Sequence, residues 1–104
     1  MRLARAPELM ACWEQGHRRR AAHLDLAWQS NTKGHPRVAI IVPRHSQSAV
    51  ARNRLRRRLR EIVRRDALAR LPAVDIVVRA RRGAYAAPFA VLRAELTDAL
   101  ARVA

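Results

Sequence analysis

The chain has 104 residues, of which 22 are Lys or Arg and 8 are Asp or Glu, so its formal charge at neutral pH is +14. Half of the residues are apolar, which suffices for the core of one domain, residues 1–104, and leaves no room for a second. So many positive charges repel one another in a folded protein, and we therefore expect a polyanionic partner, with nucleic acid as the first candidate. A membrane partner is not expected, because no apolar run approaches the roughly 18 residues that span a bilayer.

The cysteine content and the start of the chain predict a cytoplasmic protein. We expect no signal peptide at the start, since no charged n-region with an apolar h-region opens the sequence. The single cysteine, Cys12, has no partner for an internal disulfide, whereas small secreted domains usually carry paired cysteines. Cys12 is therefore expected to be a reduced thiol packed in a helix.

The positive charge is carried almost entirely by arginine, since Lys33 is the only lysine. A guanidinium group donates two parallel hydrogen bonds to a phosphate and stacks on bases, and both properties suit RNA. A genome rich in G and C would produce the same preference through its many Ala and Arg codons. Both explanations of the arginine content stay open.

The N-terminal part of the chain predicts a short helix from Pro7 to Gln15, followed by a strand. Pro7 suits a first helical position and Gly16 suits the helix end. The apolar residues at helical spacing are Leu9, Met10, Cys12 and Trp13. The basic stretch 17–20 then leads into a strand with alternating character. Its apolar positions are Leu24, Leu26 and Trp28, which alternate with His23, Asp25 and Ala27.

The next strand is predicted from Arg37 to Val42. Turn residues precede it between positions 29 and 36, and Pro43 ends it. Its residues are β-branched or small and apolar on both faces, which indicates a central position in the sheet.

The second half of the chain predicts a long helix, a strand and a last helix. The long helix runs from about Ala49 to Arg70 and is broken by Pro72. A strand follows from Val74 to Ala80. The last helix begins near Pro88 and is amphipathic. Its expected buried face consists of Phe89, Leu92, Leu96, Leu100 and Val103, and Asp98 and Arg102 form an i,i+4 pair on its outer side.

The element order is therefore helix, two or three strands, long helix, strand and helix, which is αβββαβα when three strands are counted. This order indicates an α+β fold, a two-layer sandwich in which helices pack on a mixed central sheet of about four strands.

The long helix has two chemically different sides. Between Arg52 and Arg65, eight of fourteen residues are arginine. At about 100° per residue, one side collects the apolar residues Leu55, Leu59, Ile62 and Val63. The side opposite or flanking it collects Asn53, Arg56, Arg57, Arg60 and Arg64. The alternative is a merely solvated face, but such a face normally mixes charges of both signs. We therefore interpret the basic side as a phosphate-binding surface.

The order of residues from Ala49 to Glu61 resembles the signature of the protein subunit of bacterial ribonuclease P. That family carries an Arg-Asn-Arg triplet, a basic pair and then Arg-Glu on one long helix. Here these are Arg52-Asn53-Arg54, Arg57-Arg58 and Arg60-Glu61. The strands 37–42 and 74–80 and the Arg81-Arg82-Gly83 that follows also resemble the family in position, and the resemblance covers nearly the whole chain.

The resemblance implies a small subunit that binds a large catalytic RNA and the 5′ leader of precursor tRNA, and that assists endonucleolytic removal of this leader. Catalysis would reside in the RNA, with Mg²⁺ held mainly by the RNA subunit, and no DNA partner is expected. It also implies a left-handed crossover around the long helix, an exception to the usual right-handed rule.

Carried over by position, the resemblance implies RNA contacts along the helix and in the loop before it. These residues are Arg44, His45, Arg52, Asn53, Arg54, Arg56, Arg57, Arg58, Arg60 and Arg64. Arg44 and His45 stand where the family usually has two lysines, and His45 carries charge only when protonated. Gln47 replaces a family glycine, so this loop is expected to take another path.

The resemblance is poorest in the leader-binding cleft, which the family lines with aromatic residues. The corresponding positions here are Leu9, Trp13 and Ala27, and only Trp13 offers a stacking surface. Trp13 would pack equally well as a core aromatic, so its role stays open. Trp28 lies on the other face of its strand and is expected to pack in the core.

Three other classes of protein fit parts of the sequence. A leucine-zipper factor needs heptad leucines continuing from the basic helix, which Pro72 excludes. A ribosomal protein or RNA chaperone fits the charge and size but would share the ordered motif only by chance. A protein-only nuclease needs clustered carboxylates or paired histidines. The histidines lack such spacing, His35 is expected in a turn and Glu61 in a helix ion pair, so no catalytic residue is expected in the chain.

Overall fold

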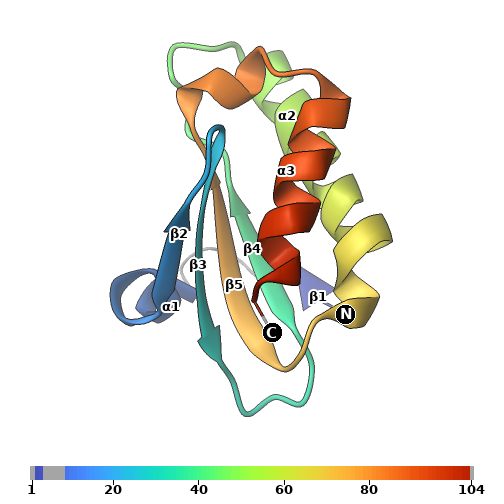
Figure 1. Ribbon diagram of the computed structural model, residues 1–104. Coiled ribbons are helices and arrows are strands. Elements are labelled where there is room, and N and C mark those ends of the chain that lie inside the picture. Colours follow the sequence, from blue (N-terminus) through green and yellow to red (C-terminus); the bar gives the residue numbers. More distant parts are fainter. Residues whose placement is uncertain (1, 4–8, 104) are drawn as a thin grey trace.

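The computed structural model describes residues 2–3 and 9–103, with the side chains of residues 9–66 and 69–103. A mixed sheet carries two longer helices on one face and a short helix on the other (Figure 1). The helices are α1 (Met10–Gln15), α2 (Ala49–Ile62) and α3 (Phe89–Ala101). The strands are β1 (Arg2–Leu3), β2 (His17–Arg20), β3 (Leu24–Ser30), β4 (Arg37–Ile41) and β5 (Val74–Ala80). The predicted α+β class is confirmed, and the predicted order αβββαβα is confirmed from α1 onward, with β1 preceding it.

The sheet has the order β1-β4-β5-β3-β2. The inner strands β4 and β5 are parallel, with Val38 opposite Ile76, and β3 runs antiparallel to β5. The sequence predicts that the basic stretch 17–20 only leads into a strand. In the structure this stretch is itself a strand, the edge strand β2. The two-residue β1 adds a fifth strand at the other edge, which a hydropathy pattern is too short to reveal.

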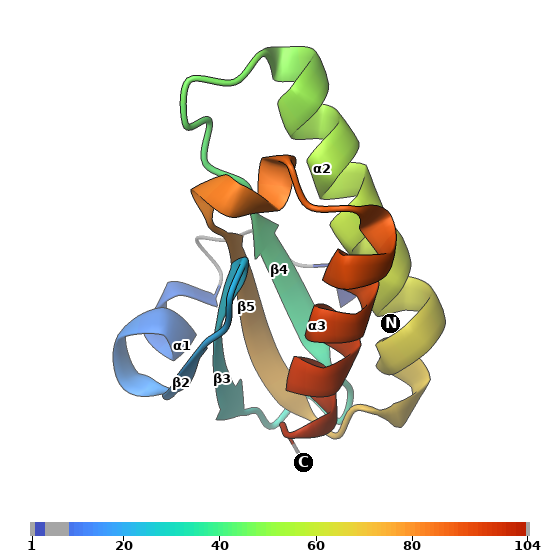
Figure 2. The same ribbon diagram turned by 45° about the horizontal axis from the view of Figure 1, so that its top comes forward.

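The connection from β4 through α2 to β5 has the left-handed sense. Seen from the side of α2 and α3 with β4 running upward, β5 lies to the left of β4 (Figure 2). A right-handed crossover would place β5 on the other side. The expectation drawn from the family resemblance is therefore met.

Two apolar clusters hold the layers together, one on each face of the sheet. The larger one packs α2 and α3 against one face and includes Leu59, Leu92 and Val78. The smaller one packs α1 against the other face through Leu9 and Cys12, which lie on Val77. Alternating residues of each strand thus enter different clusters.

The short helix α1 ends where the sequence predicted, at Gly16. A Cβ atom at this position would lie 2.4 Å from the carbonyl oxygen of Trp28, so only glycine lets the helix end approach β3 so closely. The predicted start at Pro7 lies outside the described residues.

The long helical segment from Ala49 to Arg70 changes its hydrogen bonding along its length. The Ser48 hydroxyl accepts a bond from the backbone N–H of Ala51 at 3.1 Å and caps the start. α-Helical bonding ends at Ile62, where a π-helical turn (Val63–Ala67) and a 3₁₀ turn (Leu68–Arg70) follow. The helical segment therefore begins and ends where the sequence predicts, but the prediction of an uninterrupted α-helix between these residues is wrong.

The last helix buries the predicted face with one exception. Leu92, Leu96, Leu100 and Val103 are buried. Phe89 is 40% exposed, because it opens the first turn of α3, ahead of the part that packs on the sheet and α2. Among the described helices, none has the length and apolar character needed to cross a membrane.

Candidate nucleic-acid interface

The two sides of α2 separate as predicted, except that Arg56, predicted on the basic side, is partly buried and Arg54 is exposed instead. The apolar stripe of Leu55, Leu59, Ile62 and Val63 is buried at 3% exposure or less. The residues exposed on the other side are Asn53, Arg54, Arg57, Arg60 and Arg64, while Arg52, Arg56 and Arg58 are partly buried. A packed helix therefore holds a row of guanidinium groups toward solvent, a geometry suited to phosphate oxygens.

Arg52 is tied to the protein itself. Its Nε donates a hydrogen bond of 2.7 Å to the carbonyl oxygen of Val42, the residue that follows β4. This bond fixes the first turn of α2 to the end of the central strand. Arg52 thus positions the helix and has only its terminal nitrogens to offer to an RNA.

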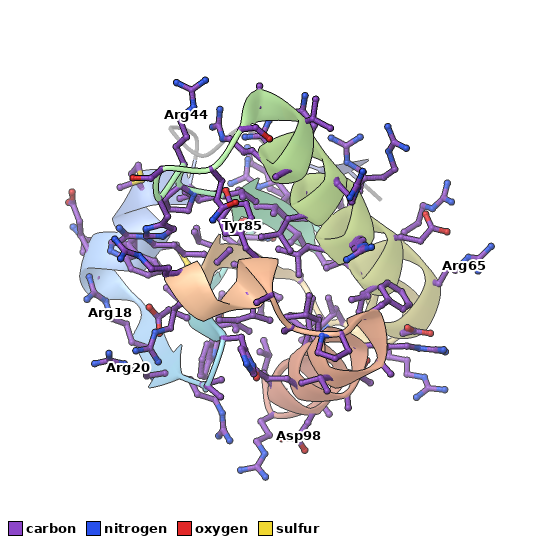
Figure 3. All side chains as sticks on the ribbon, turned by 90° about the horizontal axis from the view of Figure 1, so that it is seen from above. Arg18, Arg20, Arg44, Arg65, Tyr85 and Asp98 are labelled. Carbon is purple, nitrogen blue, oxygen red and sulfur yellow. The ribbon has the colours of Figure 1, made fainter. Side chains whose placement is uncertain are left out.

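The loop before α2 is held in an unusual backbone conformation. His45 and Ser46 have φ angles of 46° and 65°, in the left-handed region that non-glycine residues adopt uncommonly. The Tyr85 hydroxyl donates a 2.7 Å bond to the carbonyl oxygen of Pro43, and the centres of the Tyr85 and His45 rings lie 6.4 Å apart with their planes nearly perpendicular. The left-handed turn falls at 45 and 46, not at Gln47, and Arg44 points outward at the loop (Figure 3).

The C-terminal part of the basic helix is partly neutralised. Glu61 forms ion pairs with Arg64 at 3.0 Å and with Arg65 at 2.7 Å, as expected for a helix ion-pair residue. Asp66 pairs with Arg93 of α3 at 2.8 Å. The strongest uncompensated charge therefore lies in the first three turns of α2, where no acidic residue occurs.

A second group of arginines surrounds Trp13 on the α1 side of the sheet. The Arg18 guanidinium lies 4.7 Å from the centre of the Trp13 ring, and that of Arg79 lies 5.8 Å from it. Arg18 also donates two bonds, of 2.9 and 2.6 Å, to the Trp13 carbonyl oxygen, one of the free carbonyls at the end of α1. The sequence analysis missed these arginines, because only the tertiary structure brings β2 and β5 to the same ring.

The other two cleft candidates lie inside the protein. Leu9 is 1% exposed and Ala27 is 0% exposed, and both belong to the small core under α1. They support Trp13 but present almost no surface of their own to a nucleotide. Trp13 is partly exposed, and Trp28 packs against the main core on the opposite face, as expected, with the His17 ring stacked on it at 5.7 Å.

An aspartate in the sheet has an unusual environment at one end of α1. Asp75 accepts two bonds of 2.8 Å from Arg37 and one of 2.9 Å from the Asn31 amide. The hydrogen bonds from Arg37, with smaller contributions from Asn31 and Lys33, hold the Asp75 pKa below its ordinary value against the opposing effect of burial. This network joins β4, β5 and the turn after β3.

Cys12 is a free, buried thiol in α1. Burial, helped by the negative charge of Asp75, raises its pKa to about 11. Its Sγ donates a bond of 3.2 Å to the backbone carbonyl oxygen of Asp75. The thiol therefore packs as a small apolar group, and almost none of it is thiolate near neutral pH.

The histidines are dispersed in the structure. His23 bonds Glu95 of α3 at 2.8 Å, while His35 lies exposed in the turn before β4. Within the described part of the chain, no three His, Cys, Asp or Glu side chains are grouped so that they would hold a metal ion.

Comparison with known proteins gives a consistent result. The model of the Ribonuclease P family matches residues 1–104. The ribonuclease P protein component of Acidothermus cellulolyticus is 39% identical over 98% of this chain and 87% of its own length. That of Brucella suis is 42% identical over 65% of this chain and 49% of its own length, so the match spans about half of the Brucella relative.

Solved structures agree with the fold. The RNase P protein from Thermotoga maritima superposes with a TM-score of 0.86 at 25% identity, covering 98% of this chain and 97% of that one. The Staphylococcus aureus RNase P protein has a TM-score of 0.84 at 24% identity over 98% and 95% of the two chains, a likeness of fold. The match of the family model over the whole chain and the Acidothermus relative show that this chain belongs to the ribonuclease P family, as a protein component.

Proposed function

We propose that the chain acts in tRNA processing as the protein component of a ribonuclease P, bound to a catalytic RNA subunit through the outer side of α2. The observation that carries this proposal is the row of exposed guanidinium groups from Arg54 to Arg60, held by a fully buried stripe on the same helix. Family membership names the RNA partner that such a row would contact, and disfavours the ribosomal protein or RNA chaperone alternative.

The chemistry of the outer side fits phosphate better than metal. Arginine offers N–H donors and no acceptor, and Asn53 contributes one amide. These groups would position the backbone of the RNA and order water near it, while Mg²⁺ would be held mainly by RNA oxygens. In this proposal the phosphodiester hydrolysis belongs to the RNA subunit, and the protein raises the affinity for substrate and metal.

Substrate contact is proposed on the α1 side, where the 5′ leader of precursor tRNA would meet Trp13. An unpaired nucleotide needs a stacking surface and a positive charge near its phosphate. The partly exposed Trp13 with Arg18 and Arg79 supplies both. Since RNA subunit and precursor tRNA are made inside the cell, this work would take place in the cytoplasm.

Reconstitution with a bacterial ribonuclease P RNA at low Mg²⁺ tests the proposal. We expect the protein alone to cleave nothing, and the RNA with the protein to remove the leader at a Mg²⁺ concentration at which the RNA alone is inactive. Failure of the protein to lower the Mg²⁺ requirement would contradict the proposed role. Cleavage of precursor tRNA by the protein alone would overturn the assignment of catalysis to the RNA and revive the protein-only nuclease.

A further inference from the structure

The loop between β4 and α2 contains a turn that its own residues do not favour. The backbone N–H of Gln47 donates a bond of 2.8 Å to the carbonyl oxygen of Arg44, and the two residues between them, His45 and Ser46, both have positive φ angles. Two positive φ angles are typical of a type I′ turn, for which Asn followed by Gly is the preferred pair. With His and Ser in these places, contacts from outside the turn must help to hold it.

Side chains from two different elements hold the chain immediately before this turn. The consecutive carbonyl oxygens of Val42 and Pro43 each accept a bond of 2.7 Å, the first from the Arg52 guanidinium of α2 and the second from the Tyr85 hydroxyl. Tyr85 is the last residue of the 3₁₀ turn η4 (Arg82–Tyr85), which follows β5. The start of the loop is therefore fixed both to α2 and to η4.

Tyr85 itself stands on a firmly packed support. Ala84 and Ala87, on either side of it, are buried at 1% and 7% exposure, and the Tyr85 ring packs against the main core. The same ring contacts the His45 ring nearly at a right angle. The Nε2 atom of His45 is buried and has no hydrogen-bond partner within the described part of the chain, so contact with Tyr85, and not a bond at this atom, positions the His45 ring.

Arg44 lies at the outer side of the turn. Its side chain is exposed and points away from the protein, while Tyr85 lies further in (Figure 3). The direction of an exposed side chain depends on the backbone that carries it, and a turn free to relax to negative φ angles would point Arg44 in several directions. A phosphate that binds Arg44 would then have to order the loop first, and this ordering weakens affinity.

We propose that Tyr85 is a positioning residue for RNA binding, whose hydroxyl holds the turn 44–47 in the left-handed conformation that directs Arg44 at a phosphate of the catalytic RNA. The inference rests on the proposed binding of that RNA along α2. Tyr85 acts through the turn and needs no RNA contact of its own. Since its bond to Pro43 joins positions 42 residues apart, a substitution after β5 is expected to alter RNA affinity from outside the binding surface.

The test is a double-mutant cycle on the full chain, with binding to a bacterial ribonuclease P RNA measured by filter binding at several salt concentrations. Tyr85→Phe keeps the ring and removes only the hydroxyl, and it should weaken binding about 3- to 10-fold, the size expected for one hydrogen bond. Arg44→Ala should weaken binding at least as much and reduce the slope of log K against log salt by about 0.7–0.9. In the Arg44→Ala background, Tyr85→Phe should have almost no further effect.

Two further variants separate positioning from a general loss of stability. Ser46→Gly places glycine where φ is 65°, a conformation that glycine adopts without strain, and it should restore most of the affinity that Tyr85→Phe loses. Thr97→Val is the matched control, because it also removes one hydroxyl, on α3, which has no hydrogen-bond partner among the described residues. Its RNA affinity should equal that of the unmodified chain. Urea denaturation checks that each variant is folded under the binding conditions.

Three results would overturn the inference: unchanged affinity in Tyr85→Phe, losses from Tyr85→Phe and Arg44→Ala that multiply in the double variant, or no restoration by Ser46→Gly. The outcome is separable from that of the reconstitution. If reconstitution succeeds without coupling between Tyr85 and Arg44, only this inference fails. If the coupling is found but the Mg²⁺ requirement is not lowered, Tyr85 still positions the loop on the RNA, and only the proposed role in leader removal fails. If the unmodified chain does not bind the RNA, both fail.

Discussion

The outer side of α2 and the side around Trp13 are both rich in arginine but are built differently. On α2 the guanidinium groups recur along one helix, stand in solvent and are backed by a continuous buried stripe. Around Trp13 they come from β2 and β5 and lie against one aromatic ring. The first arrangement repeats a charge and suits the repeating phosphates of an RNA, while the second is a single stacking surface and suits one base.

The largest expected effect distinguishes the inner from the outer side of α2. Leu59→Ala removes a side chain that is fully buried and should lower the free energy of unfolding by about 2–5 kcal/mol. Arg57→Ala, on the exposed side, should change it by no more than about 0.5 kcal/mol. Urea denaturation measures both. Similar losses would mean that the outer side contributes to folding as well as to binding.

The next effect concerns the affinity of α2 for the catalytic RNA. The double variant Arg54→Ala with Arg57→Ala should weaken binding about 10- to 50-fold at 0.1 M salt and reduce the slope of log K against log salt by about 1.4–1.8. Filter binding at several salt concentrations measures both quantities. Arg70→Ala with Arg102→Ala removes the same charge elsewhere. If both pairs reduce the slope equally, the RNA responds to total charge and not to this helix side.

A smaller effect is expected for the second region. Trp13→Ala should weaken binding of leader-bearing precursor tRNA to the reconstituted complex by about 5- to 20-fold, which is the lower part of the roughly 1–3 kcal/mol that base stacking on an aromatic ring contributes. Mature tRNA, which lacks the leader, serves as the control and should lose much less affinity. Equal losses for the two tRNAs would favour a purely structural role for Trp13 in the core under α1.

The smallest effect concerns the support of α1. Because the folded-state pKa of Asp75 is lowered, mainly by Arg37, its ionisation stabilises the fold above its ordinary pKa, and this contribution is lost as pH falls through the lowered value. Asp75→Asn should therefore be less stable at neutral pH and lose less stability below about pH 4. Thermal unfolding from neutral to acidic pH measures the difference. Asp98→Asn, an exposed control, should keep the normal acid profile.

Much of the fold was predictable because it depends on local periodicity. The stripe from Leu55 to Val63, the central strand before Pro43 and the last helix follow from spacings of 3.6 and 2 residues. The two sides of α2 follow from the same spacing, so most of its exposed residues were found without a structure, although Arg56 is partly buried and Arg54 is exposed. The left-handed crossover was expected only through the family resemblance.

The second region was not predictable in the same way. Arg18 and Arg79 reach one ring only after the strands pair. Burial of Leu9 and Ala27 depends on how α1 lies on the sheet, which neither position reveals by its residue type. Long-range placement, not local preference, decides these features.

The π-helical turn at Val63–Ala67 has a consequence for how this helix tolerates changes in length. Such a turn holds one residue more than an α-helical turn, and it allows two successive apolar residues, Ile62 and Val63, to be buried together. Deleting a single residue here would leave an ordinary α-helical turn, which completes the same rotation with one residue fewer. The guanidinium row ahead of the deletion and the chain beyond it would therefore both keep their orientation. A difference of one residue in length among related sequences is accordingly expected to be tolerated better at this turn than elsewhere in the helix.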